Sequence, residues 1–141
     1  MIDDGLKLKG KLAIALNGDV VQEVDNLVVT AGKGYVASRI KDASATAMSH
    51  MAIGSGSTAA AASDTALGSE LGRVSLTSTT VSSAVVTYVA TFAAGTGTGA
   101  VTEAALLNAS AGVTMLCRTV FSVVNKGSAD SMTITWTVTV S

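Results

Sequence analysis

The chain has 141 residues, with 9 basic and 10 acidic side chains and a formal net charge of −1. Charged residues make up 13% of it, roughly half the share of an average soluble domain. This balance argues against a strongly basic nucleic-acid-binding protein, so we expect no nucleic-acid partner. The single cysteine, Cys117, excludes an intramolecular disulfide framework. A chain of this length is expected to form one domain, residues 1–141.

The start of the chain and its apolar runs give no indication of export or membrane insertion. The opening Met1-Ile2-Asp3-Asp4-Gly5 lacks the basic and apolar regions of a signal peptide. The longest charge-free stretch, residues 74–102, is interrupted throughout by Ser, Thr and Gly, which does not fit a spanning helix. We therefore expect a protein made and folded in a cytoplasm, with no membrane partner.

Residues 6–29 have the pattern of a β-hairpin. Alternation places two sets of side chains on opposite faces of the first strand: Leu6, Leu8, Leu12, Ile14 and Leu16 on one, and Lys7, Lys9 and Lys11 on the other. Asn17-Gly18 predicts a tight turn, and the returning strand is expected over Val20–Val29. Residues 1–29 are thus predicted to form a hairpin that can act as a contact arm.

A short helix is predicted over residues 31–42, with Thr30 as its capping residue. Its expected apolar stripe is Val36, Ala37 and Ile40. Gly32 and Gly34 weaken this helix, because glycine is a poor helix former.

The rest of the chain alternates apolar residues with Ser and Thr, as half-buried strands do. The predicted strands are Met48–Ile53, Leu71–Thr79, Ser82–Phe92, Ala100–Asn108, Val113–Val124 and Ser131–Val140. Loops are expected at 54–68 and 95–99. About eight strands and one short helix near residues 31–42 predict an all-β antiparallel sandwich, jelly-roll-like in its connections. No proline blunts the strand edges, which leaves their cover by a partner as an alternative.

The segment Gly54-Ser55-Gly56-Ser57-Thr58-Ala59 fits a dinucleotide-binding fingerprint. A working fingerprint needs a β-α-β unit and an acidic residue about 20 positions on. Asp64 and Glu70 come too early, and the following strands alternate with Thr. The interpretation favoured here is a flexible loop, and no cofactor is expected.

No cluster of reactive residues stands out in the sequence. The only imidazole, His50, and Cys117 lie in separate predicted strands, where each is more simply a structural residue than half of a catalytic pair. Asp64 and Glu103 are isolated and do not indicate paired-carboxylate chemistry. The dense acidic group Asp19, Glu23 and Asp25 lacks the spacing of a calcium loop, so we expect no metal. The chain is not expected to be an enzyme.

Lys7, Lys9 and Lys11 form a basic row roughly 13 Å long at about 3.3 Å per residue. The row has no interleaved aromatics, so it does not resemble a nucleic-acid site. It is either a solvated, edge-protecting face or a docking site for an acidic protein surface. We take these three lysines as the candidate contacts with a partner.

Four segments together resemble a family of small virion proteins of tailed bacteriophages. They are Asn26–Ala43, Met48–Arg73, Val85–Gly112 and Met115–Val140, which cover most of the chain. Relatives are often labelled tail or fibre proteins, and the full-length form is most similar to the capsid cement (decoration) proteins of short-tailed phages. The resemblance implies a jelly-roll-like β-domain that forms a homodimer and joins major capsid proteins on the outer surface of the virion. It offers no catalytic motif.

Two alternatives stay open on the sequence. One is a tail or tail-fibre component, supported by the labels of relatives. The other is a receptor- or glycan-binding β-sandwich, since such folds commonly place sugar sites on loops. A glycan site would need exposed aromatic side chains, and most aromatics here fall at core-facing strand positions.

Overall fold

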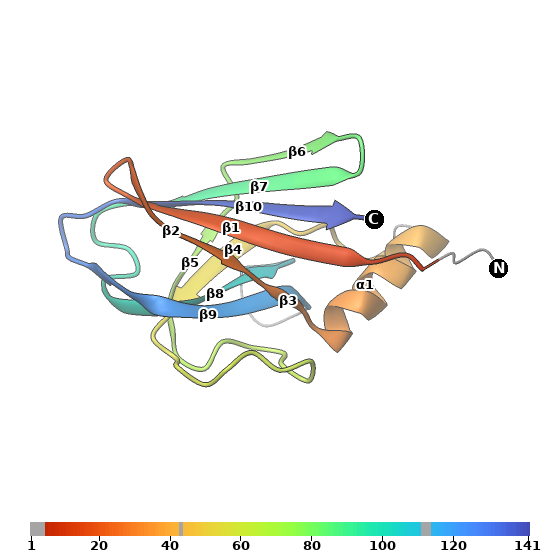
Figure 1. Cartoon of the computed structure of the whole chain (residues 1–141), viewed down its shortest axis with the longest axis horizontal. Coiled ribbons are helices and arrows are strands. Elements are labelled where there is room, and N and C mark those ends of the chain that lie inside the picture. The colour runs from red at the N-terminus through yellow and green to blue at the C-terminus, as the bar shows by residue number, and fades with distance from the viewer. Residues whose placement is uncertain (1–4, 43, 111–113) are drawn as a thin grey trace.

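The protein, seen here in a computed structural model that describes residues 5–42, 44–110 and 114–141, is a β-sandwich. Two five-stranded antiparallel sheets face each other, and one helix lies at one end (Figure 1). The predicted all-β sandwich is confirmed. The described residues contain ten strands where about eight were expected.

Both sheets draw strands from distant parts of the chain. Sheet A has the order β2 (Asp19–Asp25), β1 (Leu8–Leu16), β10 (Met132–Val140), β7 (Val85–Phe92) and β6 (Ser78–Ser82). Sheet B has the order β3 (Leu27–Val28), β9 (Met115–Lys126), β8 (Gly99–Leu107), β4 (His50–Gly54) and β5 (Glu70–Ser75). The helix α1 spans Thr30–Lys41.

The tight turn of the first hairpin is confirmed, because Asn17 and Gly18 have φ values of 50° and 89°. The predicted strand Val20–Val29 is wrong, since it splits at Asn26 into β2 of sheet A and β3 of sheet B. The indole Nε1 of Trp136 donates to the Asn26 side-chain oxygen at 2.6 Å, which fixes Asn26 at the crossing. β1 is flanked by β2 and β10, so it is an inner strand of sheet A.

The predicted strand Leu71–Thr79 also crosses between the sheets and becomes β5 and β6. The Leu76 N–H donates to the Ser49 carbonyl at 2.9 Å, whereas the Thr77 N–H donates to the Val89 carbonyl at 2.7 Å. Consecutive residues therefore bond to different sheets. The alternation of side chains gave no sign of the crossing, because an extended chain keeps its period of two while it changes sheets.

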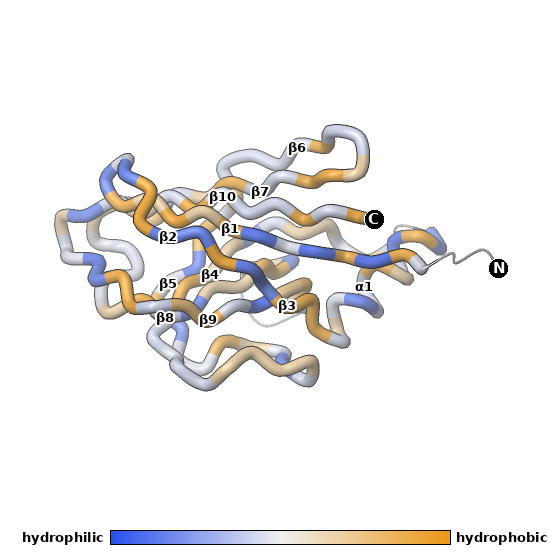
Figure 2. The backbone as a smooth tube through the Cα atoms, in the orientation of Figure 1, coloured by the Kyte–Doolittle hydropathy of each residue, from blue (hydrophilic) through white to orange (hydrophobic). Residues whose placement is uncertain are grey.

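The core lies between the sheets and is made of apolar side chains from the inner faces of both. Figure 2 shows apolar and polar residues following each other along the strands. The alternation predicted for the last strand is confirmed there: Ile134, Trp136 and Val138 are buried, while the threonines between them are half-buried on the outer face. Leu12 and Ile14 of β1 are fully buried as predicted. Leu6 is not, and its exposed fraction is 69%.

The helix is where the sequence predicted it, and Val36 of the expected apolar stripe packs against the core, but the cap and the rest of the stripe differ from the prediction. Val29 precedes the first turn without a side-chain cap, and Thr30 is already helical. Ile40, expected in the apolar stripe, is 75% exposed. The residue that allows close packing is Gly32, because a Cβ there would lie 2.1 Å from the Leu116 carbonyl oxygen. No helix in the described parts is long and apolar enough to cross a membrane.

Replacing Gly32 by alanine should therefore destabilise the fold. Its added methyl group would overlap the backbone of β9, which must move, and we expect a loss of about 2 kcal/mol in the free energy of unfolding measured by urea denaturation. The matched control is Gly34→Ala, two residues further along the same helix, where a Cβ meets no atom within 4 Å. That variant should gain about 0.5–1 kcal/mol from helix propensity. Equal effects of the two substitutions would contradict this packing.

Candidate interaction surface

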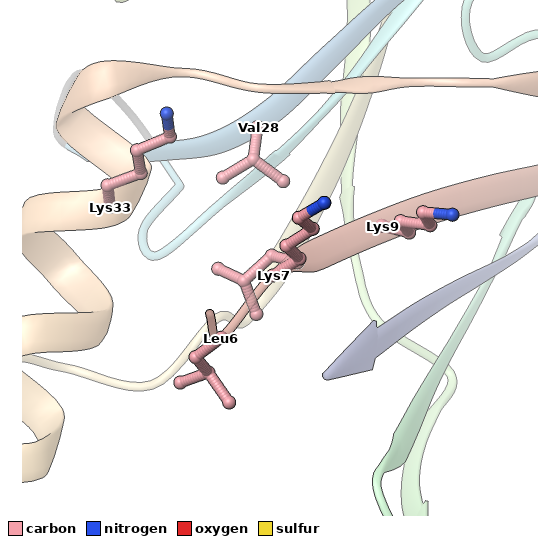
Figure 3. A pocket seen from close by; sticks show the side chains of 6 residues that line it. Leu6, Lys7, Lys9, Val28 and Lys33 are labelled. Carbon is pink, nitrogen blue, oxygen red and sulfur yellow. The ribbon is translucent and has the colours of Figure 1, made fainter. Parts of the chain in front are cut away.

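A groove with three lysines lies where the start of β1 meets α1. Lys7 and Lys9 come from the β1 side and Lys33 from the helix, with Leu6, Leu8 and Val28 as the apolar lining, and its volume is about 420 Å³. Figure 3 shows Lys33 across Val28 from Lys7 and Lys9. We call these six residues the lysine groove.

The backbone on both sides of the lysine groove is held by regular hydrogen bonds. The Lys7 N–H donates to the Ser141 carbonyl at 2.7 Å, and the Ser141 N–H donates to the Lys7 carbonyl at 2.8 Å. On the other side, the Lys33 N–H donates to the Val29 carbonyl at 3.0 Å in the first turn of α1. The main chain that carries the lysines is thus preorganised before a partner arrives.

The structure divides the predicted row of three lysines. Lys11 does not line the groove, and its Nζ lies 3.8 Å from a carboxylate oxygen of Glu23 on β2. Lys33 takes its place beside Lys7 and Lys9. Nothing in the sequence indicated that Lys33 lies near Lys7 and Lys9. The helix comes to lie beside β1 only because α1 packs against β9 and because of the strand order.

The charges of the lysine groove are not neutralised within the described residues. None of the ion pairs found there involves Lys7, Lys9 or Lys33. Beside them the exposed Leu6 and the buried Val28 offer apolar contact. Three ammonium groups next to an apolar floor attract a carboxylate-bearing segment that also carries an apolar side chain.

A second polar cluster is buried under the loop of residues 55–69. Glu103 on β8 is fully buried, and its carboxylate accepts hydrogen bonds from the backbone N–H groups of Gly56, Gly68 and Ser69 at 2.7–2.8 Å. Arg118 on β9 donates to Glu103 at 2.9 Å and to Asp64 at 2.8 Å. We call Glu103, Arg118 and Asp64 the loop latch, because it joins the loop to the outer face of sheet B.

The loop latch keeps its carboxylates ionised. Burial raises the pKa of Glu103, but the backbone N–H donors and Arg118 together outweigh it, so the pKa lies below the ordinary value of 4.5. The pKa of Asp64 is also lowered, first by the Ala61 N–H and, against some desolvation, by Arg118. A carboxylate this well paired is a structural anchor and not a poised acid or base.

The loop latch explains the glycines of the fingerprint-like segment. A Cβ at Gly56 would lie 2.4 Å from Oε2 of Glu103, so glycine is needed for the backbone to reach the carboxylate. No helix forms between β4 and β5, and residues 55–69 are a loop where one was predicted at 54–68. In the sequence, Glu103 and Asp64 look isolated. The signal that could have revealed the cluster is the charge of Glu103 within an apolar strand, because a charged side chain is usually buried only when it is paired.

His50 and Cys117 do not meet in the structure. They lie on β4 and β9, and β8 separates these strands in sheet B. Burial raises the pKa of the Cys117 thiol well above its ordinary value, which disfavours a reactive thiolate. His50 instead contacts two serine hydroxyls, with Nδ1 2.7 Å from Ser49 Oγ and Nε2 3.4 Å from Ser75 Oγ.

The acidic residues Asp19, Glu23 and Asp25 are spread along β2, and Glu23 faces Lys11. Within residues 5–42, 44–110 and 114–141, no three His, Cys, Asp or Glu side chains gather as metal ligands.

Comparison of the chain with protein-family models, curated proteins and solved structures gives no match.

Replacing Glu103 by glutamine should destabilise the protein by about 3 kcal/mol, because Arg118 would lose its fully buried carboxylate and keep only the partly exposed Asp64 as a partner. The control is Glu70→Gln, which removes a partly exposed partner of Arg73 and should cost less than about 1 kcal/mol. Urea denaturation at neutral pH measures both. Similar losses in the two variants would show that the loop latch contributes little.

The same loop latch predicts the acid side of the stability profile. Because the folded-state pKa of Glu103 lies below 4.5, the unfolded chain binds more protons in acid. The stabilisation is present above pH 4.5 and is lost as the pH falls through the lower folded-state value. Urea midpoints measured downward from neutral pH should fall less steeply in Glu103→Gln than in the wild type. Parallel profiles would contradict the assignment.

Proposed function

We propose that this chain is a structural protein of a bacteriophage virion that binds the outer surface of the assembled capsid and joins neighbouring major capsid subunits. The proposal starts from the resemblance of four long segments to phage virion proteins. The observation that carries it further is the lysine groove, whose three ammonium groups lack carboxylate partners among the described residues and stand beside an exposed leucine.

The lysine groove fits a protein partner better than a small ion. Leu6 is 69% exposed, and such a side chain gains from burial against an apolar residue of a partner. The lysines add attraction for acidic groups and steer the encounter. The partner surface that fits is therefore an acidic segment with at least one apolar side chain, displayed by the major capsid protein.

Modest contacts are sufficient for a cement protein, because it acts on an assembled lattice. Ligand that binds only the assembled state stabilises it by RT ln(1 + [L]/Kd), about 2.7 kcal/mol at a hundredfold excess over Kd. A homodimer that touches two capsid subunits raises the effective concentration of its second contact. Head stabilisation therefore does not require a large interface for each copy.

A tail or tail-fibre location is the second candidate, and it rests on the labels of similar proteins. Immunogold labelling of intact particles separates it from the capsid proposal, because antibody would decorate either the heads or the tails. The glycan-binding alternative is disfavoured by the aromatic side chains: Phe92 and Trp136 are fully buried, Tyr88 and Phe121 are 8% exposed, and Tyr35 is packed against the core. Stacking on a sugar would need one of them at the surface.

Neutralising the lysine groove should weaken binding to heads. We expect the triple variant Lys7→Ala, Lys9→Ala, Lys33→Ala to lose at least about tenfold in affinity in co-sedimentation with purified heads stripped of this chain. Wild-type binding should weaken as salt is raised, since these charges are exposed and screened.

The control carries Lys11→Ala and Lys41→Ala, which remove lysines already paired with Glu23 and Asp42. It should bind as the wild type does. A loss of affinity per removed charge that is the same in both variants would indicate a response to net charge alone and would count against the groove. Failure of the wild type to bind heads at all would refute the capsid proposal.

A further inference from the structure

The sandwich has four sheet edges, and three of them are protected against pairing with another strand. β2 carries Asp19, Glu23 and Asp25, and its pairing with β1 is broken by a register shift. β5 carries Glu70 and Arg73 and has a register shift against β4. β3 is only two residues long and runs directly into α1. Charges, bulges and short strands are the common means of blocking edge pairing.

The fourth edge, β6, has none of these features. It is Ser-Thr-Thr-Val-Ser over residues 78–82, with no charge, and it pairs with β7 in continuous register. All five residues are exposed, and Val81 is 70% exposed. Among the described residues its only strand neighbour is β7. Figure 1 shows β6 at the outer border of sheet A.

We propose that β6 pairs antiparallel with β6 of a second copy of this chain, around a two-fold axis at Thr80. The two copies of sheet A then form one continuous sheet. This deepens the proposed function, on which it rests for the expectation of a homodimer, by naming the surface through which the two copies meet.

The backbone geometry fixes the axis. A two-residue turn, Ser83–Ala84, joins β6 to β7, so Ser82 and Val85 form the hydrogen-bonded pair nearest the turn. Alternation then directs the backbone groups of Thr79 and Val81 to the free edge. An axis at Thr80 places Thr79 opposite Val81 of the other copy, so that these outward groups bond each other and all five residues overlap.

The side chains are complementary to themselves in this register. Thr80 lies opposite its own copy, Ser78 opposite Ser82, and Thr79 opposite Val81. These are uncharged and mostly β-branched pairs, which suit neighbouring strands. Self-pairing of β2 would instead bring acidic side chains together. Charge therefore favours a second copy at β6 and disfavours one at β2.

A five-residue pairing is much smaller than a standard stable interface. We therefore expect a dimer that dissociates on dilution, and the first test is a cross-link that captures weak association. Thr80→Cys should form a disulfide-linked dimer under mild oxidation, since the two positions face each other, and roughly tenfold faster than Ser78→Cys. Both positions are exposed, so cross-linking by random collision should be equally fast at the two. The native Cys117 is buried and should not take part.

Introducing a positive or a negative charge at Thr80 tests the proposed two-fold axis independently of the cross-link. Thr80→Lys and Thr80→Glu should each sediment as monomers at concentrations where the wild type is partly dimeric, because like charges would face each other. Mixing the two variants should restore a dimer. Val20→Lys, an exposed position on the opposite edge, is the matched control and should leave the dimer intact.

Two results would overturn the proposal: cross-linking of Thr80→Cys no faster than that of Ser78→Cys, or a wild-type dimer that persists in Thr80→Lys. Both are measured on the purified chain. They are therefore independent of head binding, which the lysine-groove variants test separately.

Discussion

The outer face of sheet B depends on the carboxylate of Glu103. That face carries a small apolar cluster, including Ala52, Ala105 and Leu107, against which Leu67 of the loop packs. A long irregular loop has few backbone bonds of its own, and its N–H groups need partners when it is pressed onto a sheet. Glu103 accepts three of them, and Arg118 balances its charge. The loop latch thus turns a flexible Gly- and Ser-rich segment into a cover for the sheet.

Charged side chains are scarce in this chain, and many of them lie in three distinct places. One group is buried in the loop latch, and a second forms the lysine groove, which has no ion-pair partner among the residues that the structure describes. A third group lies on the edge strands β2 and β5. Much of the remaining surface carries small hydroxyl side chains, such as the threonines of β10. Such a surface suits contacts between packed protein copies, because few ionised groups must be desolvated when two faces meet.

Sequence patterns predicted the sandwich, the Asn17-Gly18 turn and the position of the helix, since each depends on neighbours in the chain. They failed at Asn26 and at Leu76, where the chain changes sheets without changing its alternation. Of the predicted helix stripe, Val36 packs against the core but Ile40 does not, and the closest contact, at Gly32, was missed because glycine carries no apolar signal. For the site, Lys7 and Lys9 were visible as a row, whereas Lys33 was not.

The sequence by itself determined which residues alternate, where the chain turns and how few charges it has, because these are local properties of a strand or turn. Tertiary structure decided which charges meet. Glu103 and Arg118 are 15 residues apart, and Arg118 and Asp64 are 54 apart, yet one ion-pair cluster joins them. Such pairings follow from strand order, which is set by the packing of two sheets around one core and leaves no trace in any short stretch of sequence.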